Sequence, residues 1–278
     1  MTARQKILAS LVPLAVLGGV VWESLRSRIP DPICKGEHLS YWLAKYEPGV
    51  SFLGRDPAVP AIREAGTNAI PLLLHYISAH NSPFQRRMFR LMARQDLIKS
   101  SFVSDFYRHY QAVQGFWALG PRGKSAVPEL IRIYDSNFSA SSQQAVLEVL
   151  WGIGPDAKDA IPVLVHAVTN SDAGYRMLAA RALGIIRVKP ELIVPLLTVC
   201  LKDSDMDTRS VAVWALGNLG PPAKAAVPQL LKLRNATSGP PGEWATNHLP
   251  AIDEALLKID PTAAANAGIA VTNVSAAQ

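Results

Sequence analysis

The sequence predicts an all-α solenoid, a stack of helical hairpins, on two observations. One motif recurs four times, in the segments 117–130, 151–164, 182–197 and 215–231. Aligned on one shared proline, the copies keep a period of 34, 33 and 33 residues, at Pro128, Pro162, Pro195 and Pro228. Self-similarity at this period is typical of solenoids, in which each unit buries its apolar face only against its neighbours.

Each copy is expected to form two helices, A and B, joined by a turn. In the last full copy we expect helix A at about 207–216, because Gly217–Pro222 supplies glycine and proline residues that end a helix. Pro228 suits the first turn of helix B, where a missing backbone N–H costs nothing. Helix B should then end before Asn235.

Two copies depart from this pattern. The third has Arg187 and Lys189 where the others have glycine and proline, so we expect its turn to differ. An earlier copy places Pro71 57 residues before Pro128, and its unit therefore contains about two dozen extra residues.

The 278 residues divide into four predicted parts. Residues 1–23 form a hydrophobic leader, 24–56 a linker with a short capping helix, 57–262 the solenoid, and 263–278 a disordered tail without charged side chains. The capping helix has one apolar stripe at helical spacing, formed by Leu39, Trp42, Leu43 and Tyr46. The net charge of +6 permits an acidic partner without requiring one.

The leader has the composition of a membrane anchor or export signal. Arg4 and Lys6 precede sixteen residues without charge, 7–22. A helix of that length spans about 24 Å, slightly less than a hydrocarbon core of about 30 Å. We expect a single-pass anchor in the cell membrane, with the repeats on the extracytoplasmic side; a cleaved signal, giving a secreted or periplasmic protein, and a buried soluble helix are the alternatives. The membrane-anchoring side chains would include Ile7, Leu11, Leu14, Leu17, Val21 and Trp22.

The extra residues, at about 80–107, are predicted to form a basic amphipathic helix. One face carries apolar side chains such as Phe84 and Met88, and the other is basic. The candidate binding residues on the basic face are Arg86, Arg87, Arg90 and Arg94. This helix could pack on the solenoid with solvated arginines, contact anionic lipid headgroups, or bind an acidic protein or nucleic acid.

A second candidate binding surface lies on the B helices. Counting four residues past each aligned proline gives one ridge, formed by Arg132, His166, Val199 and Lys232. These positions should face away from the apolar positions Leu130, Leu164, Leu197 and Leu230. Because three of the four ridge residues can carry positive charge, the ridge suggests an acidic ligand.

Motifs for catalysis and metal binding are missing. No HExxH, P-loop, Gly-x-Ser-x-Gly or dinucleotide fingerprint occurs, and the two cysteines do not have metal-ligand spacing. We therefore predict no catalytic residues, no metal and no cofactor. Cys200 is expected to be a buried, inert thiol. Trp117 and Trp151 share one aligned position at the end of helix A and are expected to pack between repeats rather than to stack bases.

The repeated A-L-G-x-x-G-P-x-A-x-x-A-V-P-x-L pattern resembles the short HEAT repeats, also called phycobilisome-lyase HEAT-like repeats. Together with the hydrophobic leader and the Gly-x-x-Leu-Ser-x-Trp-Leu stretch at 36–43, it is similar to uncharacterised membrane-anchored HEAT-repeat proteins of planctomycete and verrucomicrobial bacteria. The resemblance implies a right-handed α-solenoid of HEAT-like helical hairpins. It also implies that the B helices line a concave groove.

The expected function is a non-catalytic, membrane-anchored interaction scaffold that binds a protein or peptide in this groove, and an acidic partner is one that its charge would suit. The alternative is an enzyme or accessory factor with its site in the same groove, either bilin-lyase-like or nucleic-acid-processing. An exported chain would not meet chromosomal DNA, so nucleic acid is an unlikely partner.

Overall fold

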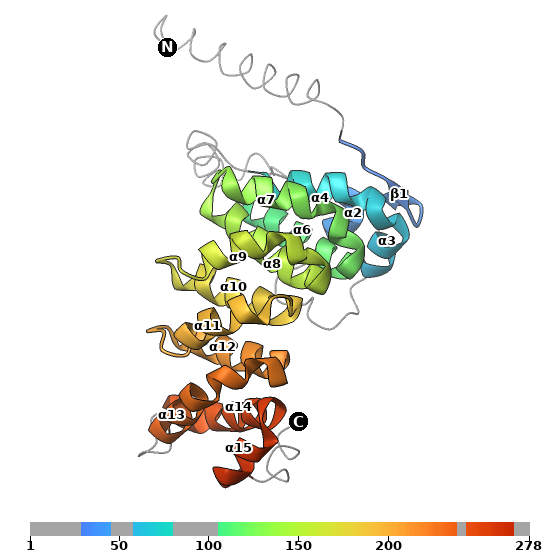
Figure 1. The fold of residues 1–278 in the computed structure, drawn as a ribbon. Coiled ribbons are helices and arrows are strands. Elements are labelled where there is room, and N and C mark those ends of the chain that lie inside the picture. Colours follow the sequence, from blue (N-terminus) through green and yellow to red (C-terminus); the bar gives the residue numbers. More distant parts are fainter. Residues whose placement is uncertain (1–28, 46–57, 80–104, 238–242, 270–278) are drawn as a thin grey trace, which may run out of the picture.

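The computed structural model describes residues 29–45, 58–79, 105–237 and 243–269. Helical hairpins follow one another in chain order and stack into an elongated solenoid, as predicted (Figure 1). The A helices are α3 (Ala58–Ala65), α6 (Asp105–Leu119), α8 (Ala140–Ile153), α10 (Ala173–Ile186), α12 (Met206–Leu219) and α14 (Glu243–Ile259). The B helices are α4 (Ile70–Ile77), α7 (Val127–Asp135), α9 (Ile161–Ala167), α11 (Pro190–Cys200), α13 (Val227–Thr237) and α15 (Pro261–Asn266).

From α6 onward the A helices form the closely packed layer of the stack, since successive A helices make extensive contacts there, whereas α6 contacts α4 more than it contacts α3. Small residues allow this approach: a Cβ on Gly184 of α10 would lie 2.5 Å from the Cβ of Ala215 in α12. Gly217 of α12 lies similarly close to Ala255 of α14. Gly217 therefore belongs to the helix, and α12 runs to Leu219 rather than ending at 216 as predicted.

Most turns between the A and B helices contain a 3-10 helix, where the sequence predicted only a turn. These segments are η2 (Gly66–Ala69), η3 (Gly120–Ala126), η4 (Gly154–Ala160) and η5 (Pro221–Ala226). Gly154 (φ 75°, ψ −140°) and Gly220 (φ 67°, ψ −142°) adopt a backbone conformation that is essentially restricted to glycine. The repeated glycine is therefore required by the geometry of the turn.

The third turn differs from the others, as expected from its sequence. Arg187 and Lys189 both adopt left-handed conformations, with φ of 55° and 57°. No 3-10 helix follows, and α11 begins directly at Pro190. As a result Pro195 lies inside the helix, whereas the aligned prolines of α7 and α9 lie in the first turn.

The N-terminal end of the solenoid is covered by a small hairpin and a short helix. Strands β1 (Ile33–Cys34) and β2 (Glu37–His38) pair antiparallel, and α2 (Leu39–Leu43) follows them. Leu39 and Leu43 are fully buried, in agreement with the predicted cap. The strands were not predicted, although Lys35 and Gly36, both with positive φ, match the two-residue turn that closes a hairpin.

The C-terminal end is ordered further than predicted. Asp260 caps α15 by accepting a hydrogen bond from the backbone N–H of Ala263 at 3.1 Å. Ile269 is buried with 4% of its surface exposed. Residues 263–269 therefore belong to the folded unit and not to a disordered tail.

Two predicted features lie outside the described residues: the leader, 1–23, and the basic face with Arg86, Arg87, Arg90 and Arg94. No helix among the described residues is both long enough and apolar enough to cross a membrane.

Candidate functional site

The predicted ridge is a real surface feature of the B helices. Arg132, His166, Val199 and Lys232 are all exposed. The side chains that should face the opposite way are fully buried: Leu130, Leu164, Leu197 and Leu230. The helical register inferred from the aligned prolines is therefore correct for all four repeats, while the binding role of the ridge stays a prediction.

The ridge extends one repeat further toward the N-terminus than predicted. His75 of α4 is exposed and stands four residues after Pro71, the proline of the earlier copy. The rule of four residues past the aligned proline, applied to Pro71, identifies His75 from the sequence. The aligned prolines are also exposed, so they form a second row beside the ridge: Pro71, Pro128, Pro162, Pro195 and Pro228.

The charge of the ridge is only partly compensated. Arg132, with 74% of its side chain exposed, forms an ion pair with Glu129 at 2.7 Å. Lys232 and His166 form no ion pair with any of the described residues. The ridge thus presents Lys232 as a cation without an ion pair in the described part of the chain and Arg132 as a paired one, and both could contact carboxylates of a partner.

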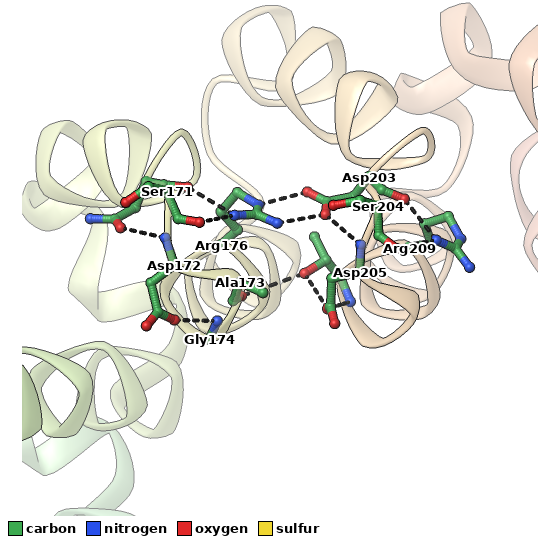
Figure 2. Close-up of polar contacts among 11 residues, drawn as sticks. Ser171, Asp172, Ala173, Gly174, Arg176, Asp203, Ser204, Asp205 and Arg209 are labelled. Carbon is green, nitrogen blue, oxygen red and sulfur yellow. Dashed lines mark hydrogen bonds and ion pairs between the residues drawn. The ribbon is translucent and has the colours of Figure 1, made fainter.

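A polar network at the turns between repeats was not found from the sequence (Figure 2). Arg176 of α10 makes a bidentate contact with Asp203, with both nitrogen–oxygen distances at 2.7 Å. Its Nη1 also donates to the carbonyl oxygens of Asn170 and Ser171. This contact joins the third repeat to the loop before the fourth.

The next repeat copies part of the network. Arg209, 33 residues after Arg176, donates to the carbonyl oxygens of Asp203 and Ser204 at 2.7 and 3.0 Å. Asp205 caps α12 by accepting from the backbone N–H of Thr208 at 2.8 Å. The signal in the sequence is the pair of similar segments Asn170–Arg176 and Asp203–Arg209. Since every group points to a loop or helix end, the network stabilises the stack rather than forming a binding site.

Trp117 and Trp151, on neighbouring A helices, pack between repeats as expected. Trp117 and Trp151 meet edge to face with ring centroids 5.0 Å apart, and Nε1 of Trp117 donates to the carbonyl oxygen of Glu148. Arg181 lies over the ring of Trp151 at 5.1 Å. Trp214 is more exposed, at 41%. Burial raises the pKa of Glu148, and the nearby Arg181 partly offsets that rise.

A buried histidine and serine meet between α6 and α8, but their geometry does not suit nucleophilic catalysis. Nε2 of His109 lies 2.7 Å from the carbonyl oxygen of Ala79 and 3.3 Å from Oγ of Ser142. A ring nitrogen that faces a carbonyl oxygen carries the proton, so this nitrogen cannot take one from the serine. Ser142 is also fully buried. We assign the pair to packing; a cavity of about 140 Å³ lies beside it.

Among the described residues, no group of His, Cys, Asp or Glu side chains could hold a metal ion. Both cysteines are buried and free. Burial raises the pKa of the Cys200 thiol to about 11, so the thiol stays protonated at neutral pH. This agrees with the expected inert role.

The comparisons with known proteins support a helical-repeat protein of the HEAT class. Residues 190–220 match the Armadillo/beta-catenin-like repeat, and residues 208–235 match the PBS lyase HEAT-like repeat. Both matches fall on the segment from α11 to α13. Repeat families of this kind commonly serve as scaffolds for protein interaction. The finer similarity to bacterial membrane-anchored proteins stays a prediction.

Curated proteins provide no match to the chain. Among solved structures, the crystal structure of an engineered protein from the Northeast Structural Genomics Consortium is similar. It is 16% identical, with a TM-score of 0.35, and the match covers 85% of this chain and 96% of that one. A likeness at this TM-score carries no argument about function.

Proposed function

We propose that this chain is a non-catalytic scaffold whose B-helix surface binds a protein or peptide partner with acidic character. The observation that carries the proposal is the ridge. Side chains at one repeated position, Arg132, His166 and Lys232, are exposed on different B helices while the positions beside them are buried. Residues at that position vary between copies and are not needed for packing, so they are free to determine which partner binds.

We also propose that the leader anchors the scaffold in the cell membrane, with the repeats on the extracytoplasmic side. The support is the run of sixteen uncharged residues, 7–22, after two basic residues. Loss of the leader by cleavage would give a secreted or periplasmic form of the same scaffold.

Charge reversal on the ridge tests the scaffold proposal. Full-length wild type and Arg132→Glu/Lys232→Glu would be compared by proximity labelling and pull-down with quantitative mass spectrometry. We expect the double variant to lose one or more partners by at least about tenfold, because like charges replace complementary ones.

A matched control is Arg122→Glu/Lys158→Glu, which makes the same change of charge at exposed positions on the turns. This control should keep the wild-type partners. If the ridge variant and the control had the same partners as wild type, the ridge would not be the binding surface.

A further inference from the structure

One B helix differs from the others in having an apolar outer face. We call it the α11 strip: the exposed residues Leu192, Pro195 and Val199 with the half-buried Leu196 beside them, at the spacing that places side chains on one face of a helix. Val199 is 71% exposed and Leu192 is 41% exposed. Val199 is also the ridge residue that breaks the cationic series.

The equivalent positions of the other repeats are mostly polar. Those aligned with Leu192 are Ser125, Asp159 and Ala225, and those aligned with Val199 are Arg132, His166 and Lys232. Pro195 belongs to the repeat pattern, whereas the large apolar side chains at the positions of Leu192 and Val199 are particular to this repeat among the four aligned copies.

The opposite face of α11 already packs on the core of the solenoid. Ile193, Val194, Leu197 and Cys200 are buried there. Single exposed apolar residues are common on protein surfaces, but a contiguous row indicates a contact with another molecule.

Cations surround the α11 strip. Arg187 and Lys189 precede its N-terminal end, Lys202 follows its C-terminal end, and Lys232 stands on the next B helix; all four are exposed. None of these four side chains forms an ion pair within the part of the chain that the structure describes. The exposed acid on the helix itself is Glu191.

Two of the nearby carboxylates already have partners, while Glu191 and Asp207 are exposed. Asp203 is held by Arg176 at 2.7 Å, and Asp205 caps α12. The strip therefore combines an apolar centre with a net positive surround.

We infer that the α11 strip docks an acidic amphipathic helix of a partner protein, an inference that rests on the proposed scaffold function. From Leu192 to Val199 the strip is two helical turns long, about 10 Å. A partner helix with apolar residues at the same spacing would cover it, and acidic residues beside them would meet the four cations. The basic segment with Arg86, Arg87, Arg90 and Arg94 has the wrong charge to occupy the strip.

The test uses the full-length chain and two fluorescein-labelled synthetic helices. Both have leucine at i, i+3, i+4 and i+7; one has glutamate and the other lysine at the flanking positions. Fluorescence anisotropy should show that the glutamate peptide binds at least about tenfold more tightly than the lysine peptide.

Two substitutions locate the contact. Leu192→Asp and Val199→Asp should each weaken binding of the glutamate peptide by about tenfold, because each places a charge in the apolar centre. Both positions are exposed, so the variants should fold, which circular dichroism would verify. Ile33→Asp is the matched control, since Ile33 is 70% exposed but lies on β1, and it should bind as wild type does.

Three results would overturn the inference: no binding of the glutamate peptide, equal affinity for both peptides, or an affinity for the glutamate peptide that Leu192→Asp and Val199→Asp leave unchanged. Val199-dependent binding to phosphatidylserine vesicles without peptide binding would assign the strip to lipid instead. If the glutamate peptide does not bind the strip but partners still depend on Arg132 and Lys232, the scaffold proposal stands without this inference. If no variant changes any partner and no peptide binds, both the inference and the scaffold proposal are wrong.

Discussion

At the scale of single residues, the turn glycines adopt backbone conformations that other residues adopt only with strain. Gly220 has φ 67° and ψ −142°, and the nearest atom to an added Cβ would be the carbonyl oxygen of Lys258 at 3.8 Å. A side chain would therefore meet no clash, and only the backbone conformation would oppose it. We expect Gly220→Ala to lower the free energy of unfolding by about 1 to 3 kcal/mol, measured by urea denaturation.

Arg187→Gly is the complementary substitution, because Arg187 stands at the aligned turn position with φ 55° and ψ 19°. A left-handed conformation costs a non-glycine residue about 1 to 2 kcal/mol. Glycine removes that strain but adds backbone entropy to the unfolded chain, about 0.5 to 1 kcal/mol. Stability should stay equal or rise slightly. A loss as large as that of Gly220→Ala would show that the backbone argument is wrong.

At the scale of elements, the Arg176–Asp203 contact couples neighbouring hairpins. Both side chains are largely buried, with 15% and 9% of their surfaces exposed. The hydrogen bonds from Arg176 hold the pKa of Asp203 below its usual value. Asp203→Asn should lower the free energy of unfolding by about 3 kcal/mol, because it leaves the guanidinium without its charged partner. Glu254→Gln, in an exposed pair with Lys258, should change it by less than about 1 kcal/mol.

The same pair predicts a pH dependence. Since the pKa of Asp203 is lowered in the folded chain, its contribution is present above the ordinary aspartate pKa of about 3.9 and is lost as the pH falls through the folded-state value. Between pH 7 and pH 3, the urea midpoint of wild type should therefore fall further than that of Asp203→Asn. Parallel midpoints for the two proteins would contradict this role of Asp203.

At the scale of the whole molecule, the proposal to test is that the leader, 1–23, anchors the chain in the membrane. Membrane fractionation would compare the full-length chain with a variant lacking residues 1–23. We expect the full-length chain in the membrane fraction and resistant to extraction by carbonate, because sixteen uncharged residues provide enough apolar surface for insertion. The shortened variant should be soluble. A full-length chain that stayed soluble in the cytoplasm would rule out both anchoring and export.

The sequence by itself determined the stack of hairpins, the register of the B helices and the exposure of the ridge. These follow from local rules: glycine and proline fix the turns, and the 33-residue period repeats each helical face from Leu130 to Leu230. The capping helix was also predictable, because its single apolar stripe can be buried only against the apolar end of the solenoid.

Only the tertiary structure decided the features that depend on neighbouring repeats. Gly217 lies inside α12, at a point where a Cβ would come within 3.1 Å of Ala255 in the next hairpin. Arg176 of α10 pairs with Asp203 in the loop before α12, and residues 27 positions apart meet only once the hairpins are stacked. The α11 strip likewise depends on how the repeats pack. A row of apolar residues in the sequence suggests core, and only the packed stack shows that Leu192 and Val199 remain exposed while Ile193 and Leu197 are buried.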